Sequence, residues 1–118
     1  MRFSKTDNIY KIIRITGSQD NILGVAFADK NNNDNNIEVI EWNFPNLVLA
    51  KGRTPTSKEE VLKQVLFGLE SVNQSLGTDY KLSKIYFSPC DIPNNRVYSA
   101  LIGFLITHYH SGNEFEEV

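Results

Sequence analysis

The chain has 118 residues, of which 41% are hydrophobic and 22% charged, which predicts a single domain, residues 1–118, that can bury a core without a disulfide or a metal. The formal net charge of −2 argues against a protein whose main task is to neutralise phosphates, so we expect no nucleic-acid partner. The chain has one cysteine, no signal-type apolar segment and no apolar run long enough to cross a bilayer. We therefore expect a cytoplasmic protein with no membrane partner.

Three strands are expected in the first third of the chain. Residues 9–15 are rich in β-branched side chains and predict the first strand. Residues 22–28 alternate large apolar side chains with glycine and alanine, and we expect a central strand whose small-residue face lets a helix approach closely. Residues 37–42 alternate apolar and polar side chains, as a half-exposed strand does, and the asparagine-rich tract 30–36 before them reads as a hairpin tip. The three strands are predicted to form an antiparallel meander.

Two amphipathic helices follow. Ser57 and Glu60 form an S-x-x-E capping box, and Gly77 stands where a helix commonly ends. A second helix is expected from about residue 97 to Gly112, with Pro93 near its entry. The apolar positions that recur with helical spacing are Val61, Leu62, Val65, Leu66, Leu69, Val72 and Leu76 in the first helix, and Val97, Tyr98, Leu101, Ile102, Leu105, Ile106 and Tyr109 in the second.

A short strand, residues 84–88, separates the two helices. Because strand–helix–strand units usually form right-handed crossovers, we expect it beside the strand of residues 9–15 and parallel to it. The predicted fold class is therefore α+β, in the order β-β-β-α-β-α, with two helices on a mixed four-stranded sheet. Residues 47–50 are either a fifth, edge strand or a buried loop, and residues 114–118 are expected to be a frayed acidic tail.

This order of elements resembles the first half of the ribonuclease H-like fold, in which three antiparallel strands precede helix, strand and helix. Residues 13–17 and 23–27 are similar to the first hairpin of that superfamily. The resemblance implies a magnesium-dependent enzyme that uses Asp91 and a helix carboxylate such as Glu60. The first strand carries Arg14 and Thr16 where the family needs a metal-binding aspartate, so the enzyme is the alternative hypothesis here.

Two local motifs have chemical and structural interpretations. His108, His110 and Glu114 resemble the first metal motif of cupins. On a helix, residues i and i+2 diverge by about 200°, so we favour histidines at a helix C-terminus and expect no metal or cofactor. Cys90 and Asp91 follow a strand and precede a helix, where a cysteine can be activated. No base lies nearby in the sequence, so a helix cap is the favoured interpretation.

The function expected from this pattern is that of a non-catalytic protein-binding module. Small, mildly acidic single domains without catalytic motifs resemble immunity proteins, which neutralise bacterial toxins, and the predicted partner is a basic toxin domain. Homodimerisation through the sheet edge or the second helix is a further hypothesis. The candidate binding residues are the aromatic anchors Trp42, Phe44, Tyr80, Tyr86 and Phe115 and the acidic residues Asp20, Asp29, Asp34, Glu38 and Glu41.

Overall fold

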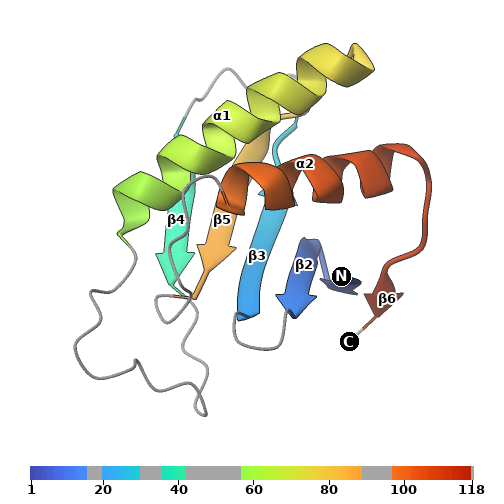
Figure 1. Cartoon of the computed structure of the whole chain (residues 1–118), viewed down its shortest axis with the longest axis horizontal. Coiled ribbons are helices and arrows are strands. Elements are labelled where there is room, and N and C mark those ends of the chain that lie inside the picture. Colours follow the sequence, from blue (N-terminus) through green and yellow to red (C-terminus); the bar gives the residue numbers. More distant parts are fainter. Residues whose placement is uncertain (16–19, 30–35, 42–56, 89–96, 118) are drawn as a thin grey trace.

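A mixed sheet and two helices make up the described part of the chain (Figure 1). The computed structural model describes residues 1–15, 20–29, 36–41, 57–88 and 97–117. In chain order the elements are β1 (Arg2–Thr6), β2 (Ile9–Ile15), β3 (Asp20–Phe27), β4 (Glu38–Glu41), α1 (Lys58–Leu76), β5 (Leu82–Phe87), α2 (Val97–His110) and β6 (Glu116–Glu117). The α+β class, the mixed sheet and the two helices are confirmed, with six strands in place of the four or five expected.

The strand order, β4-β5-β3-β2-β1-β6, differs from the predicted one. β2 and β3 pair antiparallel, as predicted. β5 lies between β3 and β4, antiparallel to β3 and parallel to β4. The predictions that the strand of residues 37–42 completes the meander, and that the strand of residues 84–88 lies beside residues 9–15, are therefore wrong. The physical reason lies in the side chains: β5 buries Leu82, Ile85 and Phe87, whereas Glu38 and Glu41 of β4 suit a solvated edge.

Both chain ends add strands that the sequence did not predict. β1 pairs antiparallel with β2 and so supplies the third strand of the meander. β6 pairs parallel with β1, with Ser4 opposite Glu116, so the expectation of a frayed tail is wrong for residues 116–117. With β5 against β3 and not against β2, the ribonuclease H-like topology is not confirmed.

The two helices cover the same face of the sheet and cross it side by side (Figure 1). The core lies between these layers, where Leu23 and Val25 of β3 and Ile85 of β5 are fully buried in one cluster with apolar residues of both helices. Since side chains alternate along a strand, Gly24 and Ala26 face away from the helices. Neither helix of the described part packs on this small-residue face, contrary to expectation, although β3 is central as predicted.

The predicted helix ends are confirmed. The Oγ of Ser57 accepts a hydrogen bond from the backbone N–H of Glu60 at 3.2 Å. Gly77 ends α1 with φ of 68°, and Gly112 follows α2 with φ of 73°, both in the left-handed region that favours glycine. Neither helix of the described part has the length and apolarity to cross a membrane. The predictions for residues 47–50 and for the helix entry around Pro93 lie outside the described residues.

Candidate functional site

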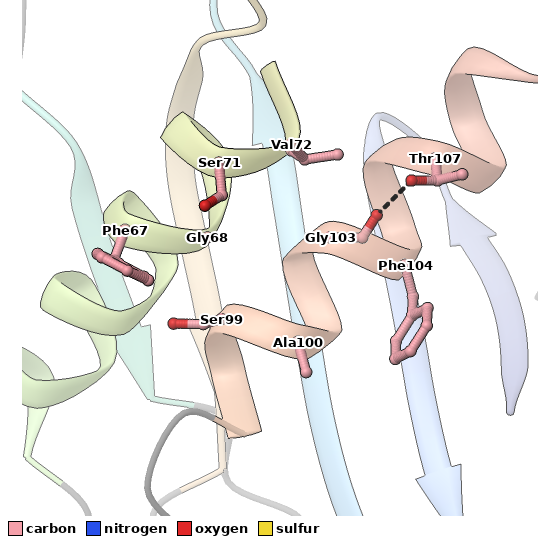
Figure 2. A pocket seen from close by; sticks show the side chains of 9 residues that line it. All are labelled: Phe67, Gly68, Ser71, Val72, Ser99, Ala100, Gly103, Phe104 and Thr107. Atoms are coloured by element: carbon pink, nitrogen blue, oxygen red, sulfur yellow. Dashed lines mark hydrogen bonds between the residues drawn. The ribbon is translucent and has the colours of Figure 1, made fainter. Parts of the chain in front are cut away.

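An apolar groove runs between the two helices on their side away from the sheet. Figure 2 shows its lining, with Phe67 standing on α1 and Phe104 on α2. The groove has a volume of about 560 Å³. None of the nine described residues that line it is ionisable; they are Phe67, Gly68, Ser71, Val72, Ser99, Ala100, Gly103, Phe104 and Thr107. The groove can therefore accept apolar side chains, but these residues supply no acid, base or metal ligand.

Small residues bring the helices together at the floor of the groove. A Cβ at Gly68 would lie 2.4 Å from the carbonyl oxygen of Ser99, so only glycine permits this approach. The hydroxyl of Ser99 donates a hydrogen bond to the backbone oxygen of Gln64 at 2.6 Å. The main chains are in contact here, so the floor of the groove is narrow. Phe67 borders the groove on α1, and Phe104 borders it on the far side of α2, where its ring points away from α1 (Figure 2).

A polar bridge holds the same crossing in register. Gln64 on α1 is 8% exposed, and its Oε1 accepts a hydrogen bond from the backbone N–H of Tyr98 at 3.1 Å. Its Nε2 donates to Oε1 of Glu60 at 2.9 Å. The first N–H groups of a helix lack partners within the helix, so Gln64 acts as a cap for α2 supplied by α1. The groove walls are therefore fixed by hydrogen bonds as well as by packing.

The rims of the groove are unusually apolar for an exposed surface. Phe67 is 63% exposed, Phe104 is 46% exposed and Leu66 beside them is 41% exposed. Leu66 belongs to the apolar stripe of α1 that was predicted to be buried, so its exposure corrects that prediction. Its side chain lies beyond the edge of the core. In addition, α2 contains no Asp, Glu, Lys or Arg. A helix surface that faces water normally carries charged residues, so this one has the character of a surface that becomes covered.

A second cluster, of aromatic rings and histidines, lies where α2 ends. His108 stacks on Phe3 with ring centroids 3.7 Å apart, and its Nε2 lies 2.7 Å from the carbonyl oxygen of Glu114. His110 Nδ1 lies 2.8 Å from the hydroxyl of Tyr80. The rings of Phe3, Tyr10, Phe27, Tyr80, Tyr109 and Phe115 pack around them.

In this cluster the ring of Phe115, in the segment after α2, packs against Phe3 of β1 and Tyr10 of β2. The pKa of Tyr109 is raised, first because burial disfavours the phenolate and then because Tyr10 and Tyr80 lie close to it. A hollow of about 320 Å³ beside Tyr109 and Phe115 is small and largely polar. The histidines bond to different partners, as the divergence of i and i+2 on a helix predicts, and no group of three His, Cys, Asp or Glu side chains in the described residues could hold a metal ion.

The residues predicted to form a binding surface are only partly brought together. Glu38 and Tyr86 lie on neighbouring strands and on the sheet face away from the helices, since Glu38 is opposite Lys84 and Ile40 is opposite Tyr86. Tyr86 is half-buried there. Glu41 is exposed but points to the other face, because it pairs with Phe87. Asp20 begins β3, and Trp42 and Phe44 lie outside the described residues.

Of the residues of the alternative enzyme site, the structure describes Glu59 and Glu60 but not Asp91. Cys90 and Asp91 lie outside the described residues. Glu59 and Glu60 stand in the first turn of α1, as expected for residues that complement the helix dipole. Since Glu60 already accepts a hydrogen bond from Gln64, nothing in the described part favours its use as a metal ligand. The enzyme hypothesis stays a prediction that depends on Asp91.

The groove was missed by reasoning from the sequence, although a signal was present. Phe67 and Phe104 fall outside the apolar stripes that predict the buried faces of the two helices. An aromatic residue on the water-facing side of an amphipathic helix is a hint of a binding surface. The absence of charge across residues 97–110 was the second hint. Comparisons with family models, with curated proteins and with solved structures found no match for this chain.

Proposed function

We propose that this chain is a non-catalytic protein-binding module and that the groove between α1 and α2 is its docking surface. The observation that carries the proposal is the pair of exposed rings, Phe67 and Phe104, beside an uncharged floor. Covering such rings removes apolar surface from water, which is the main driving force of protein association. Aromatic side chains that sit beside a hollow are typical of the residues that dominate binding energy.

The shape of the groove favours a protein over a small molecule. Its volume of about 560 Å³ is enough for a few side chains, and it is open along the helices (Figure 2). The hydroxyls of Ser99 and Thr107 are already engaged with backbone oxygens, at 2.6 Å from Gln64 and 2.8 Å from Gly103. A small polar ligand would therefore find few groups to orient it, whereas an apolar side chain needs none.

The more specific form of this proposal is an inhibitor of the immunity type, which neutralises a bacterial toxin in the cytoplasm. The exposed carboxylate of Glu41, on the sheet face that carries the helices, supports it, because it would suit a basic toxin surface; Glu38 is exposed on the opposite face. It can be tested by rescue: the product of the neighbouring reading frame is expressed in a bacterial host with and without this chain. Growth restored by the chain supports the toxin-inhibitor form, and no toxicity or no rescue contradicts it.

The docking surface itself is tested by site-specific photo-crosslinking in cells. A benzoylphenylalanine at position 104 probes the groove, and the same group at Lys84, exposed on the opposite sheet face, is the matched control. We expect a protein adduct at 104 and none at 84, with the adduct at 104 lost when Phe67 is changed to Asp. Equal labelling at both positions, or no adduct at 104, would contradict the groove as docking surface.

A further inference from the structure

Four exposed side chains on α1 have the same spacing in both directions along the helix, with an apolar pair in the middle and opposite charges at the two ends. Lys63, Leu66, Phe67 and Glu70 are all exposed. At 3.6 residues per turn, Lys63 and Glu70 lie two turns apart on the same, outward side of the helix, with the two apolar residues between them. When the direction of the helix is reversed, the lysine takes the place of the glutamate along its length, and Leu66 takes the place of Phe67.

The two charges at the ends of this pattern have no partner within the described part of the chain. Neither Lys63 nor Glu70 takes part there in an ion pair or a side-chain hydrogen bond. Each is too far along the helix to reach the other, at a rise of about 1.5 Å per residue. The pattern is therefore available for contacts with another molecule.

The position of Phe67 is complementary to the groove of a second copy. Lys63 and Glu70 define an outward ridge along α1. Successive helix residues are about 100° apart, so Leu66 and Phe67 lie on opposite flanks of this ridge. Phe67 lies on the flank that faces α2, where it forms one rim of the groove, and Leu66 lies on the far flank. The same surface thus carries an apolar projection and an apolar hollow, which is what a contact between two identical surfaces requires.

We propose that the occupant of the groove is a second copy of this chain, docked with the two α1 helices antiparallel about a two-fold axis between Leu66 and Phe67. The rotation reverses the helix direction but keeps the flank that faces α2 on the same side, so it brings Phe67 of the partner subunit over the groove between Phe67 and Phe104. It also places Lys63 beside Glu70 of the partner subunit, and by symmetry the same pair forms at the other end. The inference rests on the proposed function, since it names the partner of the same docking surface.

Charge is the reason that a second copy fits better than an unrelated partner. The ridge presents one positive and one negative end, so an acidic or a basic binder would be repelled at one of them. Only a surface with the reversed charge order satisfies both ends, and the two-fold copy has that order by construction. The uncharged face of α2 meets no opposing charge in this arrangement. The apolar contacts supply the affinity and the two ion pairs set the antiparallel direction.

Charge exchange tests the arrangement directly. The molar mass of the whole chain is measured by sedimentation equilibrium and light scattering over a wide concentration range, for the wild type, K63E, E70K and the double variant K63E/E70K. We expect the wild type to dimerise and each single variant to weaken the dimer roughly tenfold, because each places two pairs of like charges together. The double variant restores the opposite-charge pairs and should dimerise like the wild type. K84E, which reverses a lysine on the opposite sheet face, should leave the dissociation constant unchanged.

Each outcome decides between the two proposals. A wild type that stays monomeric throughout, or a double variant as weak as the single ones, overturns the dimer. If such a monomer still gives a heterologous adduct at position 104, the groove remains a docking surface and only the choice of a second copy is wrong. If there is neither dimer nor adduct, both proposals fall. Circular dichroism of all variants confirms that the fold is retained, which is expected since both residues are exposed.

Discussion

Gly68 of α1 and Ser99 of α2 are in main-chain contact, and this contact sets the distance between the helices. A Cβ at position 68 would lie 2.4 Å from the Ser99 carbonyl oxygen, 2.7 Å from its Cα and 2.5 Å from Cγ2 of Ile102. Two of these three atoms belong to the backbone, so no side-chain rotation can relieve the clash. The floor of the groove therefore depends on the glycine, and the walls stand as close as they do because of it.

The first prediction concerns this crossing. Gly68→Ala forces the helices apart and should destabilise the fold by about 1–3 kcal/mol, the usual cost of overpacking, which lowers the melting temperature by roughly 4–12 °C. Gly103→Ala is the matched control, because a Cβ there meets nothing within 4 Å. It should be stabilising by about 0.5–1 kcal/mol, since alanine favours the helix. Thermal and urea unfolding measure both, and equal effects of the two variants would contradict the contact.

The second prediction concerns the cap that α1 supplies to α2. Gln64→Leu preserves approximate size but leaves the backbone N–H of Tyr98 without that acceptor, and it removes the donor to Glu60. The expected loss of stability is about 1–3 kcal/mol, the cost of a buried polar group left unpaired. Gln74→Leu, at an exposed position of the same helix, should change stability by less than about 0.5 kcal/mol. Hydrogen exchange should show faster opening at the start of α2 only in the Gln64 variant.

The helices were predictable because their signals are local. Ser57 and Gly77 bracket α1 within one residue of its observed bounds, since a cap is decided by a few neighbouring atoms. Strand order is not local. β5 lies between β3 and β4, where a neighbouring strand on each side helps to bury Leu82, Ile85 and Phe87. Which strands become its neighbours depends on segments far apart in the sequence.

The strands at the two ends of the chain and the groove were harder to predict than the helices. β1 has one apolar side chain suited to the core, Phe3, and β6 has two residues, so neither carries a readable alternation.

For the groove, composition indicated that α2 lacks charge, but which side of α2 faces water depends on where α1 lies. The position of α1 follows from the contact at Gly68. The sequence alone does not reveal this contact, because a glycine within an apolar stripe has many structural explanations. The exposure of Phe67 and Phe104 could only follow from the packed arrangement.

The third prediction concerns the ion pair that joins the chain ends. Arg2 contacts Glu116 through two hydrogen bonds of 2.9 Å and 3.0 Å, which lower the pKa of that carboxyl. A lowered folded-state pKa gives stability that is present above the unfolded pKa and lost as the pH falls through the folded one. An NMR titration should give Glu116 a lower midpoint in the wild type than in Arg2→Gln. High salt should narrow the difference, because both side chains are exposed, and equal midpoints at low salt would contradict the pairing.

The fourth prediction uses the phenol of Tyr109, whose pKa burial raises above its ordinary value of about 10. A raised folded-state pKa means that the folded chain holds the proton longer than the unfolded chain. Its contribution to stability is complete below the unfolded pKa and is lost as the pH rises through the folded one. The free energy of unfolding of the wild type should therefore fall as the pH rises above about 10.

Tyr109→Phe should remove part of this alkaline loss of stability, because the phenyl ring retains the packing against Tyr10 and Phe27 but has no proton to lose. Urea unfolding on either side of pH 10, for the wild type and the variant, measures the difference, and ultraviolet difference titration follows the phenolates directly. Tyr86→Phe, at a tyrosine on the other face of the sheet, is the comparison. A pH profile of Tyr109→Phe that matches the wild type would show that this hydroxyl is not the group whose ionisation the fold resists.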